Sequence, residues 1–347
     1  SDIAAEPNPG AFANHLVFEP AVDTETLVAG IECVMPGEIY SIPLDRAGFT
    51  PHRRGYWRIE DSQTGPVVDV DEWLEELGRR INCAVRRSLP GHPSALTLSG
   101  GLDSSALWSD VVALRIGGFA NAMSVRPLSL FFSGYPCDEQ IFVNQTLRDT
   151  GDRVLAVDGT RETSLSLRPA LLEQVDTVPF ATSYFVWLMA KAAVADGRKT
   201  LITGHLGDHL FDIRLPGAFG RIARVLRAIL HGMFGGNRAR HAYIALRRLT
   251  QCNRHESELD ILQVDWRERI VERRWFRGLR RASPLGVIRN RLESERTAWS
   301  LRSWEQICAG FGIEVRHPFA DLDLISFAAT VPPSLLSSGL TKPGLRA

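Results

Sequence analysis

The sequence predicts an α/β protein built around a doubly wound parallel sheet. Between about residues 70 and 204, short apolar segments typical of strands alternate with segments of helical periodicity. Two of the strand-like segments are followed by small and polar residues, in "SGGLDSS" and "GHLGDHLFD". Because ligands of such sheets bind beyond the carboxyl ends of the strands, we expect both polar stretches to lie at a ligand-binding edge.

The elements follow in chain order. Residues 1–66 are rich in Pro, Gly and short alternating segments such as "EIYSIPL", which predicts a small β-rich piece. A helix begins near Asp71 and is stopped by "PGHP" at residues 90–93. The apolar positions at helical spacing are Leu74, Leu77, Ile81, Ala84 and Val85.

Strands and helices then alternate. The predicted strands are residues 95–99, 128–132, 153–158 and 199–204, and the predicted helices lie near residues 104–116, 138–149 and 181–196. The remainder, from about residue 214 to 347, is predicted to be mostly helical with no clear strand.

Composition excludes several classes of protein. The 347 residues carry 40 Lys and Arg against 40 Asp and Glu, so no global charge argues for a nucleic-acid or anionic-membrane partner. No apolar run reaches the roughly 20 residues that span a bilayer, and no signal peptide opens the chain. The five cysteines include no C-x-x-C pair, which argues against a disulfide framework or a cysteine zinc site. We expect a cytoplasmic protein.

The stretch "TLSGGLDSS" has the chemistry of a phosphate loop. Gly100 and Gly101 lack Cβ atoms, so backbone N–H groups can approach an anion, and the following helix directs its positive end at the same point. Asp103 would repel a bare phosphate and makes most sense as a Mg²⁺ ligand. Hydroxyl donors to phosphate are available from Ser99, Ser104 and Ser105. The lysine of a Walker A loop is absent.

The S-G-G-x-D-S string after an apolar strand resembles the pyrophosphate loop of ATP pyrophosphatases, which cleave ATP to AMP and pyrophosphate. Further segments resemble the asparagine synthetase superfamily in the right order: "SGYPCDEQIFVNQTLRDTG", "TLITGHLGDHLF" beside the family's S-G-x-G-x-D-E-L-F, "GIEVRHPFADLD" beside E-x-R-x-P-F-x-D, and "TKPGLR" beside K-x-x-L-R. Residues 11–45 are similar to the end of that family's glutaminase-like domain.

The resemblance implies a five-stranded sheet of the ATP pyrophosphatase fold with a helical C-terminal half. It also implies two domains: residues 1–66, a β-rich remnant of the glutaminase-like domain, and residues 67–347, an ATP-dependent synthetase domain.

The family's site residues carry over where the motifs match. Asp103 and Asp208 would hold Mg²⁺ on the ATP phosphates, with Thr203 and Gly204 beside the nucleotide. Lys342 matches the lysine that neutralises negative charge as the acyl-adenylate forms and is consumed. The candidates for the adenine side are Leu98, Phe131 and Phe132.

Two features depart from the family. The chain opens "SDIAAEPNPG" without the amino-terminal cysteine of glutamine hydrolysis, so, unless a preceding portion exists, the amine must come from elsewhere. His205 replaces an acidic residue of the motif, and His209 replaces the glutamate after the metal aspartate. An imidazole can accept the proton of an attacking amine, so His205 is a candidate general base; the alternative is that it only hydrogen-bonds the loop backbone.

A further clue concerns the size of the substrate. Between Ile213 and His255 there is no Asp or Glu, so the arginines of this segment have no acidic neighbours in the sequence. The default interpretation is a basic helix face exposed to solvent, and the alternative is a surface that binds pyrophosphate or the carboxylates of a peptide. The arginines are Arg214, Arg221, Arg224, Arg227, Arg238, Arg240, Arg247, Arg248 and Arg254. Asparagine synthesis would not need so wide a surface.

Together these features favour a resemblance to lasso-peptide cyclases. Such an enzyme, with ATP and Mg²⁺ as cofactors, adenylates an Asp or Glu side chain of a precursor peptide and closes a macrolactam with the peptide's amino-terminal amine. The family's partners would be the precursor, a leader-peptide recognition protein and a leader peptidase. The alternatives are a glutamine-hydrolysing asparagine synthetase, a β-lactam or other small-molecule synthetase, and an inactive homologue that binds a peptide or nucleic acid.

Overall fold

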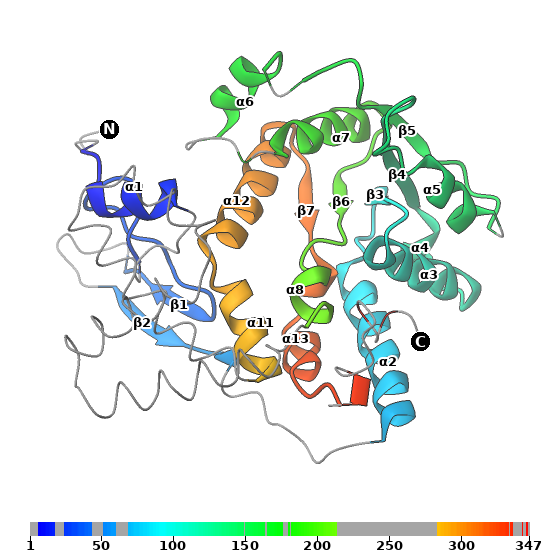
Figure 1. Cartoon of the computed structure of the whole chain (residues 1–347), viewed down its shortest axis with the longest axis horizontal. Coiled ribbons are helices and arrows are strands. Elements are labelled where there is room, and N and C mark those ends of the chain that lie inside the picture. Colours follow the sequence, from blue (N-terminus) through cyan, green and yellow to red (C-terminus); the bar gives the residue numbers. More distant parts are fainter. Residues whose placement is uncertain are drawn as a thin grey trace, which may run out of the picture. The chain divides into compact units, whose positions relative to one another are not determined.

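A computed structural model describes residues 6–17, 24–43, 51–59, 69–148, 150–163, 165–175, 180, 182–213, 283–332, 334–335, 342 and 345, without the side chain of Glu295. The helices are α1 (Pro9–Leu16), α2 (Val70–Ser88), α3 (Leu102–Ile116), α4 (Ala120–Met123), α5 (Gln140–Leu147), α6 (Arg168–Gln174), α7 (Ser183–Ala195), α8 (Gly207–Phe211), α11 (Pro284–Leu292), α12 (Glu295–Gly310) and α13 (Leu322–Ala328), with a 3-10 helix, η3 (Pro318–Ala320). The strands are β1 (Glu38–Ser41), β2 (His52–Gly55), β3 (Ser94–Thr97), β4 (Val125–Phe131), β5 (Leu155–Asp158), β6 (Thr200–Ile202) and β7 (Glu314–Arg316) (Figure 1).

The chain divides into two compact units, Ser1–Gln63 with Arg214–Ala298 and Thr64–Ile213 with Trp299–Ala347. In the first unit, β1 and β2 form an antiparallel pair, and the Asn8 side chain caps α1 by accepting from the N–H groups of Gly10 and Ala11. Helix α1 is an element that the sequence analysis did not predict. The glutaminase-like origin of residues 1–66 and their boundary with residues 67–347 stay predictions.

The second unit contains the predicted parallel sheet. Its five strands run in the order β5-β4-β3-β6-β7, and every neighbouring pair is parallel. The chain therefore moves outward from β3 through β4 to β5 and then returns to the other side of β3 with β6 and β7. This reversal between β3 and β6 is a topological switch point, where the connections after the two strands diverge and leave room for a ligand. The predicted fold class is confirmed.

Strand β7 corrects the sequence analysis, which expected no strand after residue 214. Only Val315 of its three residues is apolar, and Glu314 and Arg316 pair with each other through their side chains. A segment this short shows no measurable alternation, and it is a strand because its backbone completes the ladder beside β6. From residue 283 onward the other described elements are helical, as predicted.

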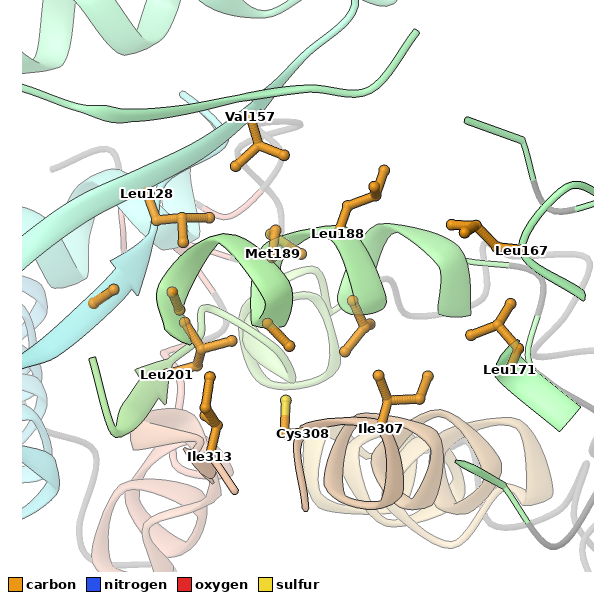
Figure 2. Close-up of a cluster of buried hydrophobic side chains, with 14 of the residues drawn as sticks. Leu128, Val157, Leu167, Leu171, Leu188, Met189, Leu201, Ile307, Cys308 and Ile313 are labelled. Carbon is orange, nitrogen blue, oxygen red and sulfur yellow. The ribbon is translucent and has the colours of Figure 1, made fainter. Parts of the chain in front are cut away.

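Helix α7 packs against β4 and β5 on one face of the sheet, and α6 and α12 contribute to the same buried cluster (Figure 2). Helix α7 is apolar on several sides because it lies between strands and another helix, and Ala190 and Ala193 in its second half are fully buried. Leu128 and Leu201 contribute from the strands, and Ile307 contributes from α12. Since successive strand residues alternate, Leu96 and Ile202 point to the opposite face.

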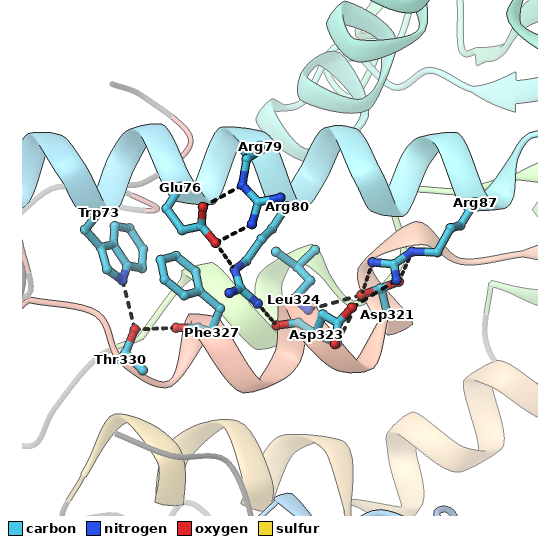
Figure 3. Close-up of polar contacts among 10 residues, drawn as sticks. All are labelled: Trp73, Glu76, Arg79, Arg80, Arg87, Asp321, Asp323, Leu324, Phe327 and Thr330. Carbon is cyan, nitrogen blue, oxygen red and sulfur yellow. Dashed lines mark hydrogen bonds and ion pairs between the residues drawn. The ribbon is translucent and has the colours of Figure 1, made fainter. Parts of the chain in front are cut away.

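Helix α2 carries the predicted apolar stripe and also holds the C-terminal helix α13. Trp73 stacks on Phe327 at 5.3 Å between ring centroids and donates from its indole N–H to Thr330. At the other end of α2, Arg87 pairs with Asp321 and Asp323 (Figure 3). These contacts join segments more than 200 residues apart in the sequence.

Asp110 of α3 is a carboxylate packed against α2, where Asn82 donates to it at 2.8 Å. Burial raises its pKa from 3.8 to about 6. The folded state thus binds this proton more tightly than the unfolded chain, so the associated stability is present below pH 4 and is lost as the pH rises through 6. We expect Asp110→Asn to raise the free energy of unfolding at pH 8 by about 1–3 kcal/mol and to leave it nearly unchanged at pH 4.

Thermal unfolding at the two pH values measures this difference. Glu75→Gln is the matched control, because Glu75 lies on the exposed side of α2 and its loss of charge should matter by less than about 0.5 kcal/mol. An Asp110→Asn protein that is less stable than the wild type at pH 8 would contradict the expectation.

The arginine-rich segment from Arg214 to His255 lies outside the described residues. Among the helices that the structure does describe, none combines the length and apolarity that crossing a bilayer requires.

Candidate functional site

The loop after β3 turns sharply at Gly100, whose φ is +74°. A Cβ at this position would lie 2.6 Å from Cβ of Phe142 on α5. Both the left-handed backbone and the close approach of α5 therefore require glycine. The loop and α5 are held further by Ser105, whose hydroxyl lies 3.3 Å from that of Thr146.

The hydroxyl groups of Ser99 and Ser104 stabilise the loop through hydrogen bonds within it. They lie 3.1 Å apart, the N–H of Ser99 donates to Ser104 Oγ, and Ser104 in turn donates to the carbonyl of Gly101. Helix α3 begins at Leu102 without a side-chain cap. The N–H groups in the first turn of this 15-residue helix are therefore not used by a side-chain cap. They lie at the switch point, where they can bind an anion.

The loop after β6 lies directly against the start of α3. A Cβ on Gly204 would be 3.2 Å from the backbone nitrogen of Ser104, and a Cβ on Gly207 would be 2.3 Å from Cγ of Asp103. Glycine at both positions lets the two loops approach each other. The close approach brings Asp208, the second residue of α8, to the same place as Asp103.

Lys342 joins these two acidic residues. Its Nζ lies 2.6 Å from Asp103 Oδ2 and 2.6 Å from Asp208 Oδ1. The side chains of Lys342 and Asp103 are 15% and 17% exposed, whereas that of Asp208 is 74% exposed. The three residues that the sequence placed in one site are therefore together, with one cation between two carboxylates.

The electrostatics of this group follow from burial. Burial raises the pKa of Asp103, against the opposing effect of its hydrogen bond from Lys342. For Lys342, burial opposes the charge, but the hydrogen bonds to Asp103 and Asp208 outweigh it and raise the pKa. An adjacent cation thus favours the ionised form of Asp103 against the effect of burial.

The residues present fit a magnesium ion. Asp103 and Asp208 each place an oxygen 2.6 Å from the same nitrogen, so both carboxylates converge on the position of one cation. The other oxygen of Asp103 is buried and has no hydrogen-bond partner in the described part of the chain. Among the described residues, no third His, Cys, Asp or Glu side chain joins these two as a metal ligand.

The residues proposed for the adenine side lie next to the core. Leu98 is buried and its N–H extends the β3–β4 ladder to Leu128. Phe131 is also buried, whereas Phe132 is partly exposed, packs edge-on against Phe185 and leaves no space for a side chain at residue 159. Of these three residues, only Phe132 combines an aromatic ring with exposure at the strand end.

Histidines gather after β6 and β7. The ring centroid of His205 lies 6.1 Å from that of His209 and 5.6 Å from that of His317. Thr203 is buried and links the two loops, since its hydroxyl accepts from the N–H of His205 and lies 2.6 Å from Nδ1 of His317. Burial lowers the pKa of His205, which keeps its imidazole neutral near pH 7.

Residues 76–347, more than half of the chain, match the family model described as Asparagine synthase. The chain belongs to the asparagine synthase family. Membership in this family supports an ATP-dependent ligase-type enzyme.

The solved structures that the chain matches include an NH3-dependent NAD synthetase from Campylobacter jejuni in complex with the nitrate ion. It has 15% sequence identity and a TM-score of 0.28, covering 60% of this chain and 94% of that chain. A U34-tRNA thiolase, NcsA, from Methanococcus maripaludis with its [4Fe-4S] cluster has 14% identity and a TM-score of 0.29, covering 62% of this chain and 84% of that chain. Similarity at this level assigns no activity. No curated protein sequence matches the chain.

Two residues of the loops after β6 and β7, Leu206 and His317, were not predicted from the sequence. In S-G-x-G-x-D-E-L-F, the second glycine corresponds to Leu206, which adopts a left-handed backbone with φ of +75°. Gly207 follows it and makes room for Asp103. His317 occupies an x position of E-x-R-x-P-F-x-D, so the motif predicts no role for it. The aligned glycine was the available signal for Leu206, and no sequence signal pointed to His317.

Proposed function

We propose that this protein uses ATP to adenylate an Asp or Glu side chain of a precursor peptide and closes a macrolactam with the peptide's amino-terminal amine, as a lasso-peptide cyclase does. The observation that supports an adenylating site is the convergence of Asp103, Asp208 and Lys342 at 2.6 Å contacts beside the switch point. These residues come from three segments far apart in the chain. Ionisable side chains that converge in this way are typical of functional sites.

Each part of the site has a role in this proposal. The loop from Ser99 to Ser105 and the start of α3 bind the phosphates of ATP. Asp103 and Asp208 hold Mg²⁺, which neutralises phosphate charge when it is bound there. Thr203 and Gly204 lie beside the nucleotide. Leu98 and Phe132 are the proposed adenine side.

The chemistry has two steps. A carboxylate oxygen of the peptide attacks the α-phosphorus, the bond to the β-phosphate bridging oxygen breaks, and pyrophosphate leaves. Lys342 stabilises the negative charge that develops in this step. The peptide's amine then attacks the acyl carbon, its proton passes to His205, and the acyl–oxygen bond breaks to release AMP. Binding both ends of one peptide makes the second step effectively unimolecular.

The proposed partners follow from the same function. The precursor peptide is the substrate, and a leader-peptide recognition protein and a leader peptidase would deliver it in the cytoplasm. No part of the proposal needs nucleic acid.

The direct test supplies Mg·ATP and a panel of linear peptides with a free amino terminus and one internal Asp or Glu. Mass spectrometry should show loss of one water from a peptide together with release of AMP. The same peptide with an acetylated amino terminus is the matched control, and it should not cyclise. AMP release that depends on a small amino-acid derivative and ignores every peptide would replace this proposal with a small-molecule synthetase.

His205→Gln separates the two steps. We expect peptide-dependent exchange of pyrophosphate into ATP to persist, because adenylation needs no base at His205, while ring closure falls by about 10²–10⁴-fold. Exchange assays and product analysis on one protein preparation measure both. Equal loss of exchange and closure would assign His205 to the structure of the loop.

A further inference from the structure

Two imidazoles lie side by side at the carboxyl edge of the sheet. His205 follows β6 and His317 follows β7, and Trp304 of α12 stands 6.4 Å and 6.3 Å from their ring centroids. The backbone of His317 is held extended by the following Pro318, and its carbonyl accepts from Ala320. The position of this ring is therefore set by the chain around it.

Thr203 determines which nitrogen of His317 carries the proton. A hydroxyl has one hydrogen to donate, and Thr203 Oγ1 already accepts from the N–H of His205. Its only other contact in the described residues is Nδ1 of His317 at 2.6 Å. If Nδ1 carried the proton, the buried hydroxyl hydrogen of Thr203 would lack an acceptor, which is costly. The hydroxyl therefore donates to Nδ1, and the proton of the neutral ring is on Nε2.

The Nε2 atoms of the two rings are available to a ligand. Nε2 of His317 and Nε2 of His205 are both buried and have no hydrogen-bond partner among the described residues. Burial, with a smaller effect from His205, lowers the pKa of His317 to about 3, so the ring stays neutral. His317 is thus a neutral donor with one N–H to give.

We propose that Nε2–H of His317 donates a hydrogen bond to the carbonyl oxygen of the activated acyl group. The inference rests on the proposed function and adds a residue that binds the acyl group during ring closure. The hydrogen bond strengthens as negative charge builds on this oxygen under attack by the amine, and no proton leaves His317. When the bond to AMP breaks, the carbonyl re-forms.

Other occupants fit the donor less well. A donor directed at the attacking amine would occupy the lone pair that must form the new bond. The phosphates already have the N–H groups at the start of α3. The two imidazoles therefore take opposite roles, with His205 accepting the amine's proton and His317 holding the acyl oxygen.

The tautomer is tested first, without any substrate. In protein labelled with ¹⁵N-histidine, NMR should show His317 as the Nε2–H tautomer, assigned by its loss in His317→Gln. Thr203→Val removes the hydroxyl that donates to Nδ1 and should abolish the preference. An Nδ1–H tautomer in the wild-type protein overturns the inference.

Binding tests the acyl contact. The probes are Mg·ATP, 5′-O-sulfamoyladenosine, and sulfamoyladenosine acylated by the side-chain carboxyl of aspartate, a stable mimic of the adenylate. We expect the wild type to bind the acylated probe more tightly than the bare one, and His317→Ala to lose about 10-fold of that preference while its affinity for Mg·ATP is unchanged. His317→Gln, which retains an N–H donor, should keep part of the preference.

His92→Ala is the matched control. His92 lies 2.9 Å from Thr200 at the opposite end of β6, so it repeats the His–Thr pair away from the switch point. It should leave the acyl preference intact. An unchanged preference in His317→Ala, or equal affinity of the wild type for both sulfamoyl probes, overturns the inference. Failure of the wild type to bind Mg·ATP instead refutes the proposed function, so the two failures are distinguishable.

Discussion

Lys342→Met is expected to lower the rate of peptide-dependent AMP formation by about 10²–10³-fold at saturating ATP. Methionine keeps most of the length of the side chain and removes the charge that lies 2.6 Å from both carboxylates. Electrostatic groups directed at a developing charge in a closed site contribute on the order of 3–4 kcal/mol to catalysis. The measurement is AMP release with a peptide that the wild type cyclises.

The same substitution has a consequence for stability that requires no substrate. Asp103 would keep its buried carboxylate and lose its hydrogen-bonded cation, which should lower the free energy of unfolding by about 1–3 kcal/mol. Added Mg²⁺ should restore part of this loss in Lys342→Met and raise the melting temperature of the wild type less. Lys199→Met is the control, because Lys199 is exposed just before β6. Full activity of Lys342→Met would contradict the role given to this lysine.

Gly207→Ala is expected to weaken the binding of Mg·ATP by at least about 10-fold. The new Cβ would lie 2.3 Å from Cγ and 2.6 Å from Oδ2 of Asp103, the oxygen that Lys342 contacts. The carboxylate must move or α8 must shift away, and overpacking of this kind costs about 1–3 kcal/mol of stability. Calorimetry with Mg·ATP and thermal unfolding measure the two effects.

A double-mutant cycle identifies the clash as the cause. If the Cβ acts through Asp103, Gly207→Ala should cost much less stability when it is made in an Asp103→Ala background. Gly78→Ala is the matched control: this position on α2 has nothing within 4 Å of a new Cβ, and the change should stabilise the protein by roughly 0.5–1 kcal/mol. Equal losses for Gly207→Ala in both backgrounds would mean that residue 207 acts through the backbone of α8.

Buried and exposed contacts contribute differently at this site. The Lys342–Asp103 pair is largely removed from water, whereas Asp208 is mostly exposed although it lies equally close to Nζ. A solvent-exposed partner adds little to stability. We therefore assign Asp103 the larger part in the stability of the site, while both carboxylates serve the proposed metal.

The sequence by itself determined four of the five strands of the sheet and the place of the candidate site. Apolar segments of strand length are visible without tertiary information because β3 and β6 are buried on both faces. The glycines that follow these strands are equally visible, because few other residue types permit the backbone to approach an anion. The serines and aspartates beside them are visible as donors to phosphate and ligands for a metal ion. The resemblance of four ordered motifs then led to the family, which the match over residues 76–347 shows.

Only the tertiary structure decided which of these residues meet. Strand β7 has too few apolar residues to be recognised alone, yet it carries His317 to the switch point by pairing with β6. Lys342 reaches Asp103 across 239 positions of sequence, and the need for Gly207 arises solely from the side chain packed against it. Such contacts depend on distances between elements. Local periodicity and composition carry information about each segment and none about its neighbours in space.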